Sequence, residues 1–189
     1  MSKLDILTLV QNSDKFLIRN NITSSRFCPQ DLKMVIEFVE NSTPSTITPL
    51  VHKTLSFHSE CMKHRIDDGR KYWKFLDNSN CVAIIGFHNR IWDPSSLCWG
   101  GWFCAAKTLP SRGKLGVLGY LLRTCLETQN IQRILIEVYG DEIDSNVYQI
   151  YKKLGFQEIG TIRDFYGANK KMITMSVDLV ALRSIGISL

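Results

Sequence analysis

The 189-residue sequence has few of the features that would place it outside the class of single globular domains. It contains only 5 prolines, no low-complexity tract and no internal repeat, so nothing in it marks a linker or an array. It has no run of 18 or more apolar residues, which excludes an obvious membrane-spanning helix. With 44% hydrophobic and 22% charged residues, it indicates one domain, residues 1–189, that buries a substantial core.

A secretory leader and a disulfide framework are also missing. Asp5 lies where a leader would carry only basic charge, so we expect a cytoplasmic protein. The 6 cysteines include no CxxC pair, and most lie in apolar runs such as that from Cys81 to Ile85. Thiols of this kind stay reduced in the cytosol, and we therefore expect core thiols rather than disulfides or metal ligands.

The histidines do not form a metal-binding pattern. His52, His58 and His64 lie six residues apart in a predicted helix, and six residues turn a helical side chain roughly 120° away from the first. The three side chains therefore cannot share one face, and we expect no metal cofactor.

The charge balance is only modestly basic. There are 23 Lys and Arg residues against 18 Asp and Glu residues, a net charge of +5. Such a surface attracts anions without being basic enough for a histone-like wrapper. Two partner classes fit this balance: a phosphorylated small ligand and a nucleic acid.

The first half of the chain predicts strands and amphipathic helices. A helix from Asp31 is indicated by Leu32, Val35, Ile36 and Val39 at helical spacing. The other elements expected here are a first strand over 15–20, a helix over 50–65, and strands over 70–76 and 81–88 joined by a tight turn at 77–80.

The second half predicts a strand, glycine turn, helix and strand order. A strand over 97–106 contains the Gly100-Gly101 pair, which suggests a bulge or a close backbone approach. The later elements expected are a helix after residue 118, a strand over 131–138, a helix over 144–154 and strands over 156–161 and 171–179. A crossover helix between strands favours parallel pairing, so we predict an α/β fold.

A glycine-rich segment after the strand predicts an anion site. Gly113, Gly116 and Gly119 can leave backbone N–H groups pointing into one concavity, and a helix N-terminus adds positive charge. The charged residues from 107 to 133 are five cations and one acid, a balance of +4: Lys107, Arg112, Lys114, Arg123, Arg133 and Glu127. Close packing between helices is the alternative explanation for the glycines.

Two familiar phosphate-binding motifs do not fit this segment. A Walker loop needs GxxxxGK, but Leu118 stands five residues after Gly113. A dinucleotide fingerprint needs GxGxxG, whereas the spacing here is GxxGxxG, and Glu137 lies inside its strand rather than at its end.

Two motifs together resemble the GNAT superfamily of acyl-CoA-dependent N-acetyltransferases. The first is Arg112-Gly113-Lys114 opening a helix, similar to the family's Q/R-x-x-G-x-G/A loop, and the second is the run from Tyr151 to Phe156, similar to Tyr-x-x-x-Gly-Phe. The resemblance extends from about residue 80 to 179, and more loosely to Phe16–Arg19 and the helix from Asp31.

The resemblance implies a GNAT-like fold. That fold has a mixed central sheet of six to seven strands flanked by about four helices, with a splayed pair of central strands. Residues 1–95 would form the acceptor side, and residues 96–179 the acyl-CoA-binding core.

The resemblance also implies acetyl-CoA as the acyl donor. Its pyrophosphate would lie on the amides of residues 112–117, and its pantetheine arm along the strand that ends at Ala105 to Lys107. The candidate binding residues are Ala105, Ala106, Lys107, Arg112, Gly113, Lys114, Leu115, Gly116, Val117, Gly119 and Asp144. Leu115 replaces a glycine of the family pattern, and Asp144 stands where the family often has an asparagine that contacts pantetheine.

The implied chemistry is direct attack of an amine on the thioester. Tyr151 resembles the family tyrosine that protonates the leaving thiolate, although a core tyrosine on the stripe of its helix is the alternative. The strand over 97–106 lacks the acid that often serves as base in the family. Candidates for the base are Glu137 and Glu142, then Asp141, Asp93 and His88.

The acceptor is the least determined part of the prediction. We expect a small-molecule or peptide amine, bound by the N-terminal half and by residues 91–102, whose tryptophans are Trp92, Trp99 and Trp102. The sequence offers no ring of acids for a polyamine or an aminoglycoside. The alternatives are a nucleic-acid-modifying or nucleic-acid-binding protein and a non-catalytic CoA-binding module. Edge strands near the C-terminus could pair in a homodimer.

Overall fold

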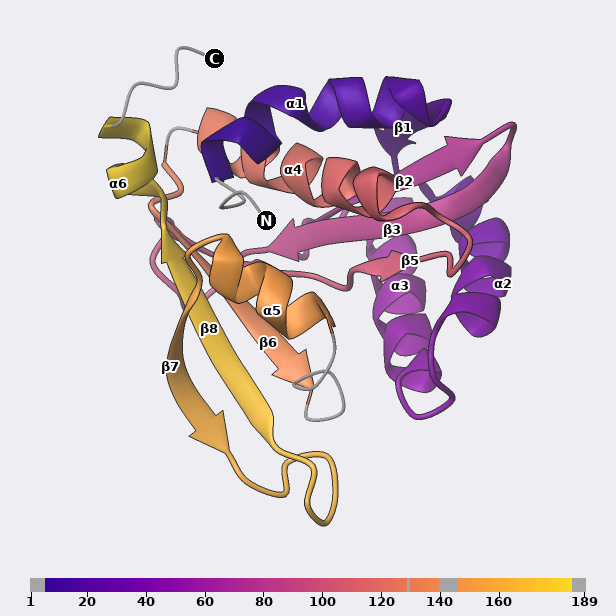
Figure 1. The fold of residues 1–189 in the computed structure, drawn as a ribbon. Helices are drawn as coiled ribbons and strands as arrows, with labels where there is room; N and C mark the ends of the chain where they lie inside the picture. The colour runs from indigo at the N-terminus through magenta and orange to yellow at the C-terminus, as the bar shows by residue number, and fades with distance from the viewer. Residues whose placement is uncertain (1–5, 129, 140–145, 185–189) are drawn as a thin grey trace.

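A computed structural model describes residues 6–128, 130–139 and 146–184 (Figure 1). In chain order the elements are α1 (Ile6–Arg19), β1 (Ile22–Arg26), a 3₁₀ turn (Pro29–Asp31), α2 (Leu32–Ser42), α3 (Thr48–Lys63), β2 (Arg70–Asp77), β3 (Asn80–His88), β4 (Leu97–Gly100), β5 (Cys104–Ala105), α4 (Ser111–Glu127), β6 (Arg133–Tyr139), α5 (Asn146–Lys153), β7 (Gln157–Ile162), β8 (Met172–Asp178) and α6 (Leu179–Ser184).

The fold is built on one mixed sheet, as the resemblance implies, but the described residues form more strands and helices than the six to seven strands and about four helices expected. It has 8 strands in the order β1-β2-β3-β4-β6-β8-β7, with β5 paired to β3. Only the β4–β6 pair is parallel among the described strands. Helices α1 and α4 lie over one face of the sheet, and α2 and α3 over the other (Figure 1). No helix in the described part of the chain is long and apolar enough to cross a membrane.

The two central strands separate after a short contact, which confirms the expected splay. The β4–β6 pairing joins Leu97–Trp99 to residues 133–135, after which β5 follows β3 and β6 follows β8 (Figure 1). The strand predicted over 97–106 is therefore two strands, β4 and β5, with residues 101–103 between them.

The prediction of a first strand over 15–20 is wrong, because these residues end α1. Leu9, Val10 and Leu17 are buried on one side of that helix, a helical spacing that extends upstream of the predicted strand. The actual first strand, β1, has the sequence ITSSR and buries only Ile22. It lacks the apolar alternation by which a strand is recognised.

The glycine segment lies within a helix rather than in a turn. Its glycines serve close packing between helices, which is the alternative explanation given above. Helix α4 begins at Ser111, and Gly113, Gly116 and Gly119 are all buried within it. A Cβ on Gly116 would lie 3.0 Å from Phe16 Cβ, and one on Gly119 would lie 2.8 Å from the Leu9 carbonyl oxygen.

This packing removes several residues from the predicted anion site. Val117 is fully buried in the core. Beyond the first turn, helix amides bond to the helix's own carbonyls, so Gly116, Val117 and Gly119 cannot present N–H groups to a ligand. The amides that can still face an anion are those of Ser111, Arg112 and Gly113, since the Lys114 amide already bonds to the Pro110 carbonyl at 3.1 Å.

The positive charge is also less concentrated than the sequence indicates. Arg123 pairs with Asp14 and with Glu127, and Arg133 approaches Asp178 at 3.7 Å. These two arginines are therefore engaged elsewhere, which leaves three of the five cations near the start of α4: Lys107, Arg112 and Lys114.

We expect Gly119→Val to lower the free energy of unfolding by about 1–3 kcal/mol, because the added side chain would meet the backbone of α1. Gly160→Val is the matched control, since nothing lies within 4 Å of a Cβ at that exposed strand position. Chemical denaturation measures both. Equal midpoints for the two variants would contradict a tight seam between α1 and α4.

Candidate active site

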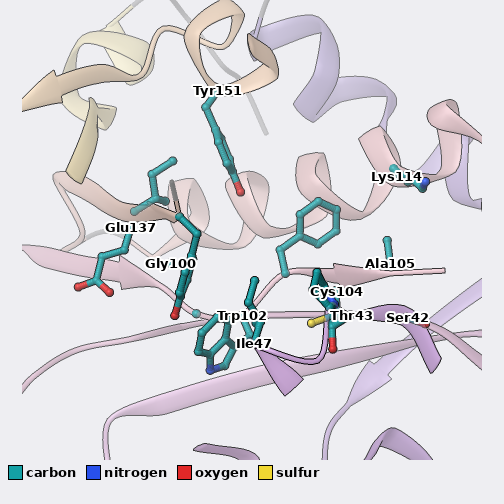
Figure 2. A pocket seen from close by; sticks show the side chains of 15 residues that line it. Ser42, Thr43, Ile47, Gly100, Trp102, Cys104, Ala105, Lys114, Glu137 and Tyr151 are labelled. Carbon is teal, nitrogen blue, oxygen red and sulfur yellow. The ribbon is translucent and has the colours of Figure 1, made fainter. Parts of the chain in front are cut away.

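A cavity of about 260 Å³ opens where the central strands separate (Figure 2). Residues 100–105 line it from the β4–β5 side, and Ile136, Glu137 and Tyr139 line it from β6. Tyr151 of α5, Lys114 of α4 and the connection between α2 and α3 complete its wall. The splay of the strands therefore brings together segments from five parts of the chain.

Tyr151 is directed into this cavity. It extends from α5 toward the strand segment that carries Gly100 and Trp102, with its hydroxyl foremost (Figure 2). Its ring also packs against Phe156, with centroids 5.3 Å apart, and against the core. The ring is thus packed as a core tyrosine would be, while the same side chain lines the cavity; its role as a proton donor stays a prediction.

The buried side chain of Tyr72 contacts the segment Gly101–Trp102, which lines the cavity. The hydroxyl of Tyr72 accepts a hydrogen bond from the Trp102 amide at 3.3 Å, and the Gly101 amide bonds to the Gly86 carbonyl at 2.7 Å. A Cβ on Gly101 would lie only 2.7 Å from the Tyr72 hydroxyl, so the glycine pair permits the expected close backbone approach. Burial raises the pKa of Tyr72 to about 12, which keeps the phenol protonated.

A second cavity, of about 210 Å³, adjoins the first. The two share five lining residues: Gly100, Gly101, Trp102, Glu137 and Tyr139. The second is otherwise lined by Thr54, Arg70, Tyr72, His88 and Arg90. Trp102 is fixed at the boundary, because its indole N–H bonds to Thr54 Oγ1 at 3.1 Å and its ring stacks on Tyr139.

Glu137 lies at the junction of the two cavities. Its neighbours Ile136 and Val138 point into the core, so strand alternation turns the carboxylate toward the opposite face of the sheet. Arg90 donates a hydrogen bond to Glu137 Oε1 at 3.3 Å, and both side chains are about one-third exposed. Glu137, one of the residues predicted as the base, therefore has its carboxylate at both cavities.

His88 lines the second cavity as a neutral imidazole. Burial, and after it the nearby guanidinium groups of Arg70 and Arg90, lower its pKa from 6.5 to about 4. Its Nδ1 is buried with no hydrogen-bond partner among the described residues.

The remaining predicted site residues lie in several different surroundings. Ala105 and Lys114 line the first cavity, while Arg112 and Lys107 are exposed near it. Ala106 and Leu115 pack partly against the core. Asp141, Glu142 and Asp144 lie outside the described residues, and Asp93 accepts a hydrogen bond from Trp99 Nε1 at 2.7 Å.

Sequence reasoning missed Tyr72, Tyr139 and the two arginines of the second cavity. Arg70 and Tyr72 alternate along β2, and Arg70 is paired in register with His88. Such alternation shows that two residues share a face, but a cavity between distant strands leaves no local signal. Among residues 6–128, 130–139 and 146–184, no three His, Cys, Asp or Glu side chains converge to hold a metal ion.

The lowered pKa of His88 predicts a specific acid sensitivity. Between pH 6.5 and about 4 the unfolded chain binds a proton at this residue and the folded protein does not, so stability falls as the pH falls through that range. We expect His88→Gln to flatten the slope of unfolding free energy against pH by up to about 1.4 kcal/mol per pH unit. The exposed His52, as His52→Gln, is the control, and equal slopes in both variants would contradict the assignment.

Comparison with known proteins identifies the fold. No family sequence model and no curated protein sequence matches the chain. Solved structures do match. A Desulfovibrio desulfuricans protein assigned to the GNAT family of acetyltransferases has a TM-score of 0.67 at 16% identity, over 84% of this chain and 99% of that chain.

Two further structures have the same arrangement. A variant of the spermidine/spermine N-acetyltransferase of Vibrio cholerae has a TM-score of 0.66 at 14% identity, over 88% of this chain and 99% of that chain. The ribosomal-protein-S18-alanine N-acetyltransferase of Escherichia coli has a TM-score of 0.60 at 14% identity, over 84% of this chain and 94% of that chain. The chain therefore has the fold of the GNAT acetyltransferases.

Proposed function

We propose that the protein is an N-acetyltransferase that moves an acetyl group from acetyl-CoA to an amine. The observation that carries this proposal is the pair of adjoining cavities at the splayed strands, with Tyr151 directed into the first and Glu137 reaching both. One cavity suits the donor and the other the acceptor, with Gly100 and Trp102 between them. The structural neighbours include enzymes named for acetylation of spermidine and of a ribosomal-protein alanine, which supports an amine acceptor.

The residues around the first cavity suit acetyl-CoA, which has an anionic pyrophosphate and a long pantetheine arm containing amides. The first-turn amides of α4, at Ser111, Arg112 and Gly113, would bind pyrophosphate oxygens together with the positive end of the helix. Lys114 stands at one end of the cavity and Glu137 at the other, and the segment up to Ala105 lies between them (Figure 2). That segment is bonded to β3 along one edge, so backbone groups on its other edge would bond to the arm.

The side chains divide the two proton transfers between them. Acetyl-CoA supplies an acyl group activated as a thioester. As the new C–N bond forms and the C–S bond breaks, Tyr151 donates its phenol proton to the departing sulfur and later regains one from water. Glu137 accepts the proton that the amine loses, directly or through a bridging water. Trp102 and Tyr139, stacked at the boundary, would exclude bulk water.

Acetyl-CoA binding is the first test. At about 100 times its Kd, acetyl-CoA should raise the unfolding free energy by about 2.7 kcal/mol, which a thermal-shift assay detects. Lys114→Gln should weaken binding about fivefold, because one of the cations near the phosphates is lost. Lys153→Gln, an exposed lysine at the end of α5, should leave binding unchanged. Absence of any stabilisation by acetyl-CoA would refute the proposed function.

Loss of the phenol hydroxyl tests the catalytic role of Tyr151. Tyr151→Phe should reduce kcat about 10²–10⁴-fold and leave the KM for acetyl-CoA nearly unchanged, because the ring still packs on Phe156. Tyr148→Phe is the matched control on the same helix, since the Tyr148 hydroxyl bonds to Glu158 instead. Release of free CoA thiol measures turnover. Turnover at the wild-type rate in Tyr151→Phe would contradict the assignment of Tyr151 as the general acid. If the unmodified protein binds acetyl-CoA but shows no turnover, a non-catalytic CoA-binding module is favoured instead.

A further inference from the structure

The second cavity has two arginines that are held in place by their neighbours. Arg70 Nη1 bonds to Asp68 Oδ2 at 3.1 Å, and the buried Asp68 is itself bonded to His58 Nδ1 at 2.9 Å. The guanidinium carbon of Arg90 lies 3.8 Å from the ring centroid of Trp99. Each guanidinium has five N–H donors in a fixed plane, so each keeps donors for a ligand beyond the bond already made.

The ion pair between Arg90 and Glu137 can open so that each of its two partners binds a ligand instead. Its N–O distance is 3.3 Å, and both partners are about one-third exposed, so the pair contributes little by itself. A molecule with both an ammonium and a carboxylate can replace it on both sides. The ammonium takes the place of Arg90 at Glu137, and the carboxylate takes the place of Glu137 at Arg90.

A polyamine does not satisfy the same groups. It would bring further positive charge to a cavity whose charged lining residues are Arg70, Arg90 and Glu137, and by occupying Glu137 it would leave Arg90 without its anionic partner. Both arginines act to lower the pKa of the His88 imidazole, after burial and against the weaker opposing effects of Asp68 and Asp93, so their positive charge reaches the cavity. The same potential favours a carboxylate.

An apolar groove continues from the second cavity. It encloses about 760 Å³ and shares Arg70, His88 and Arg90 with that cavity. Its large apolar side chains are unusually exposed: Phe57 is 55%, Ile66 58%, Trp92 78% and Ile91 94% exposed. An exposed apolar cluster next to a polar cavity is typical of a ligand surface.

The two acids of this groove differ in their surroundings. Asp68 is buried and bonded to His58 and Arg70, whereas Asp67 is exposed and its Oδ1 accepts a hydrogen bond from the Gly69 amide at 2.9 Å. The groove therefore offers apolar contact next to the arginines, with one exposed carboxylate beside it.

From this arrangement we propose that the acceptor is an apolar α-amino acid. Its amine lies at Glu137, its carboxylate is bound by Arg90 and Arg70, and its aliphatic or aromatic side chain lies on the groove formed by Phe57, Ile66, Ile91 and Trp92. This inference rests on the proposed function, since it names the acceptor of that acetyl transfer.

The test compares matched pairs of amines with acetyl-CoA as donor. Phenethylamine is L-phenylalanine without its carboxylate, and glycine is an amino acid without the apolar side chain. We expect kcat/KM for L-phenylalanine to exceed those for phenethylamine and glycine by about 10-fold or more, because charge-assisted hydrogen bonds and apolar contact are lost in turn. Spermidine should be a poorer substrate than L-phenylalanine.

The variant Arg90→Gln tests whether Arg90 causes the preference for an amine that carries a carboxylate. In this variant the ratio of kcat/KM for L-phenylalanine to that for phenethylamine should fall to near one. Arg133→Gln removes an exposed arginine that pairs with Asp178 at the far end of β6, and it should retain the wild-type ratio. An unchanged ratio in Arg90→Gln, or a preference for spermidine or for a peptide N-terminus, would overturn the proposal.

Direct binding separates this inference from the proposed function. Ligand-observed NMR compares L-phenylalanine with phenethylamine on the unmodified protein, with and without CoA. Preferential binding of the amino acid that disappears in Arg90→Gln supports the acceptor assignment even if no acetyl-CoA turnover is found. No preference in either condition overturns the assignment, while acetyl-CoA stabilisation would still support the donor site.

Discussion

The end of pairing between β4 and β6 is the constraint on which the site depends. These parallel strands pair only from Leu97 to Trp99, opposite residues 133–135, and the first cavity opens beyond the last of these pairs. Separation leaves backbone at the centre of a sheet, where a missing partner is normally costly. The structure manages this cost through Tyr72, whose hydroxyl accepts from the Trp102 amide, and through the glycine pair that lets the segment lie against it. Replacing either would disturb both cavities at once.

The two cavities differ in the chemistry of their walls, although they share Glu137. The first has Lys114, Tyr151 and backbone from residues 100–105, a surface for a long flexible molecule with an anionic end. The second has fixed guanidiniums and a neutral imidazole, a surface that orients a small charged molecule. A single carboxylate at their junction can therefore take a proton from the molecule in one cavity as bonds change in the other.

Much of this could be predicted from sequence where the signal is local. The stripe of α2, the alternation of β8 and the direction of Glu137 on β6 all follow from periodicity, and the motif ending in Phe156 located Tyr151. The sequence does not predict strand β1, because four of its five residues are polar and exposed. It predicts an anion site at the glycines of α4, since a spacing that suits close helix contact also suits a turn. Arg70 and Arg90 required the sheet itself to bring them together.

The contact at Gly116 and Gly119 connects the N-terminal helix to α4, whose first turn is the proposed phosphate site. The glycines of α4 contribute no side chain to this contact, and a Cβ on Gly119 would lie 2.8 Å from the Leu9 carbonyl oxygen, so the two helices pack closely at this point. The first turn of α4, where the phosphates would lie, is therefore positioned by residues about one hundred places earlier in the chain. An element from the first twenty residues of the chain therefore positions the start of a helix that lies in its second half.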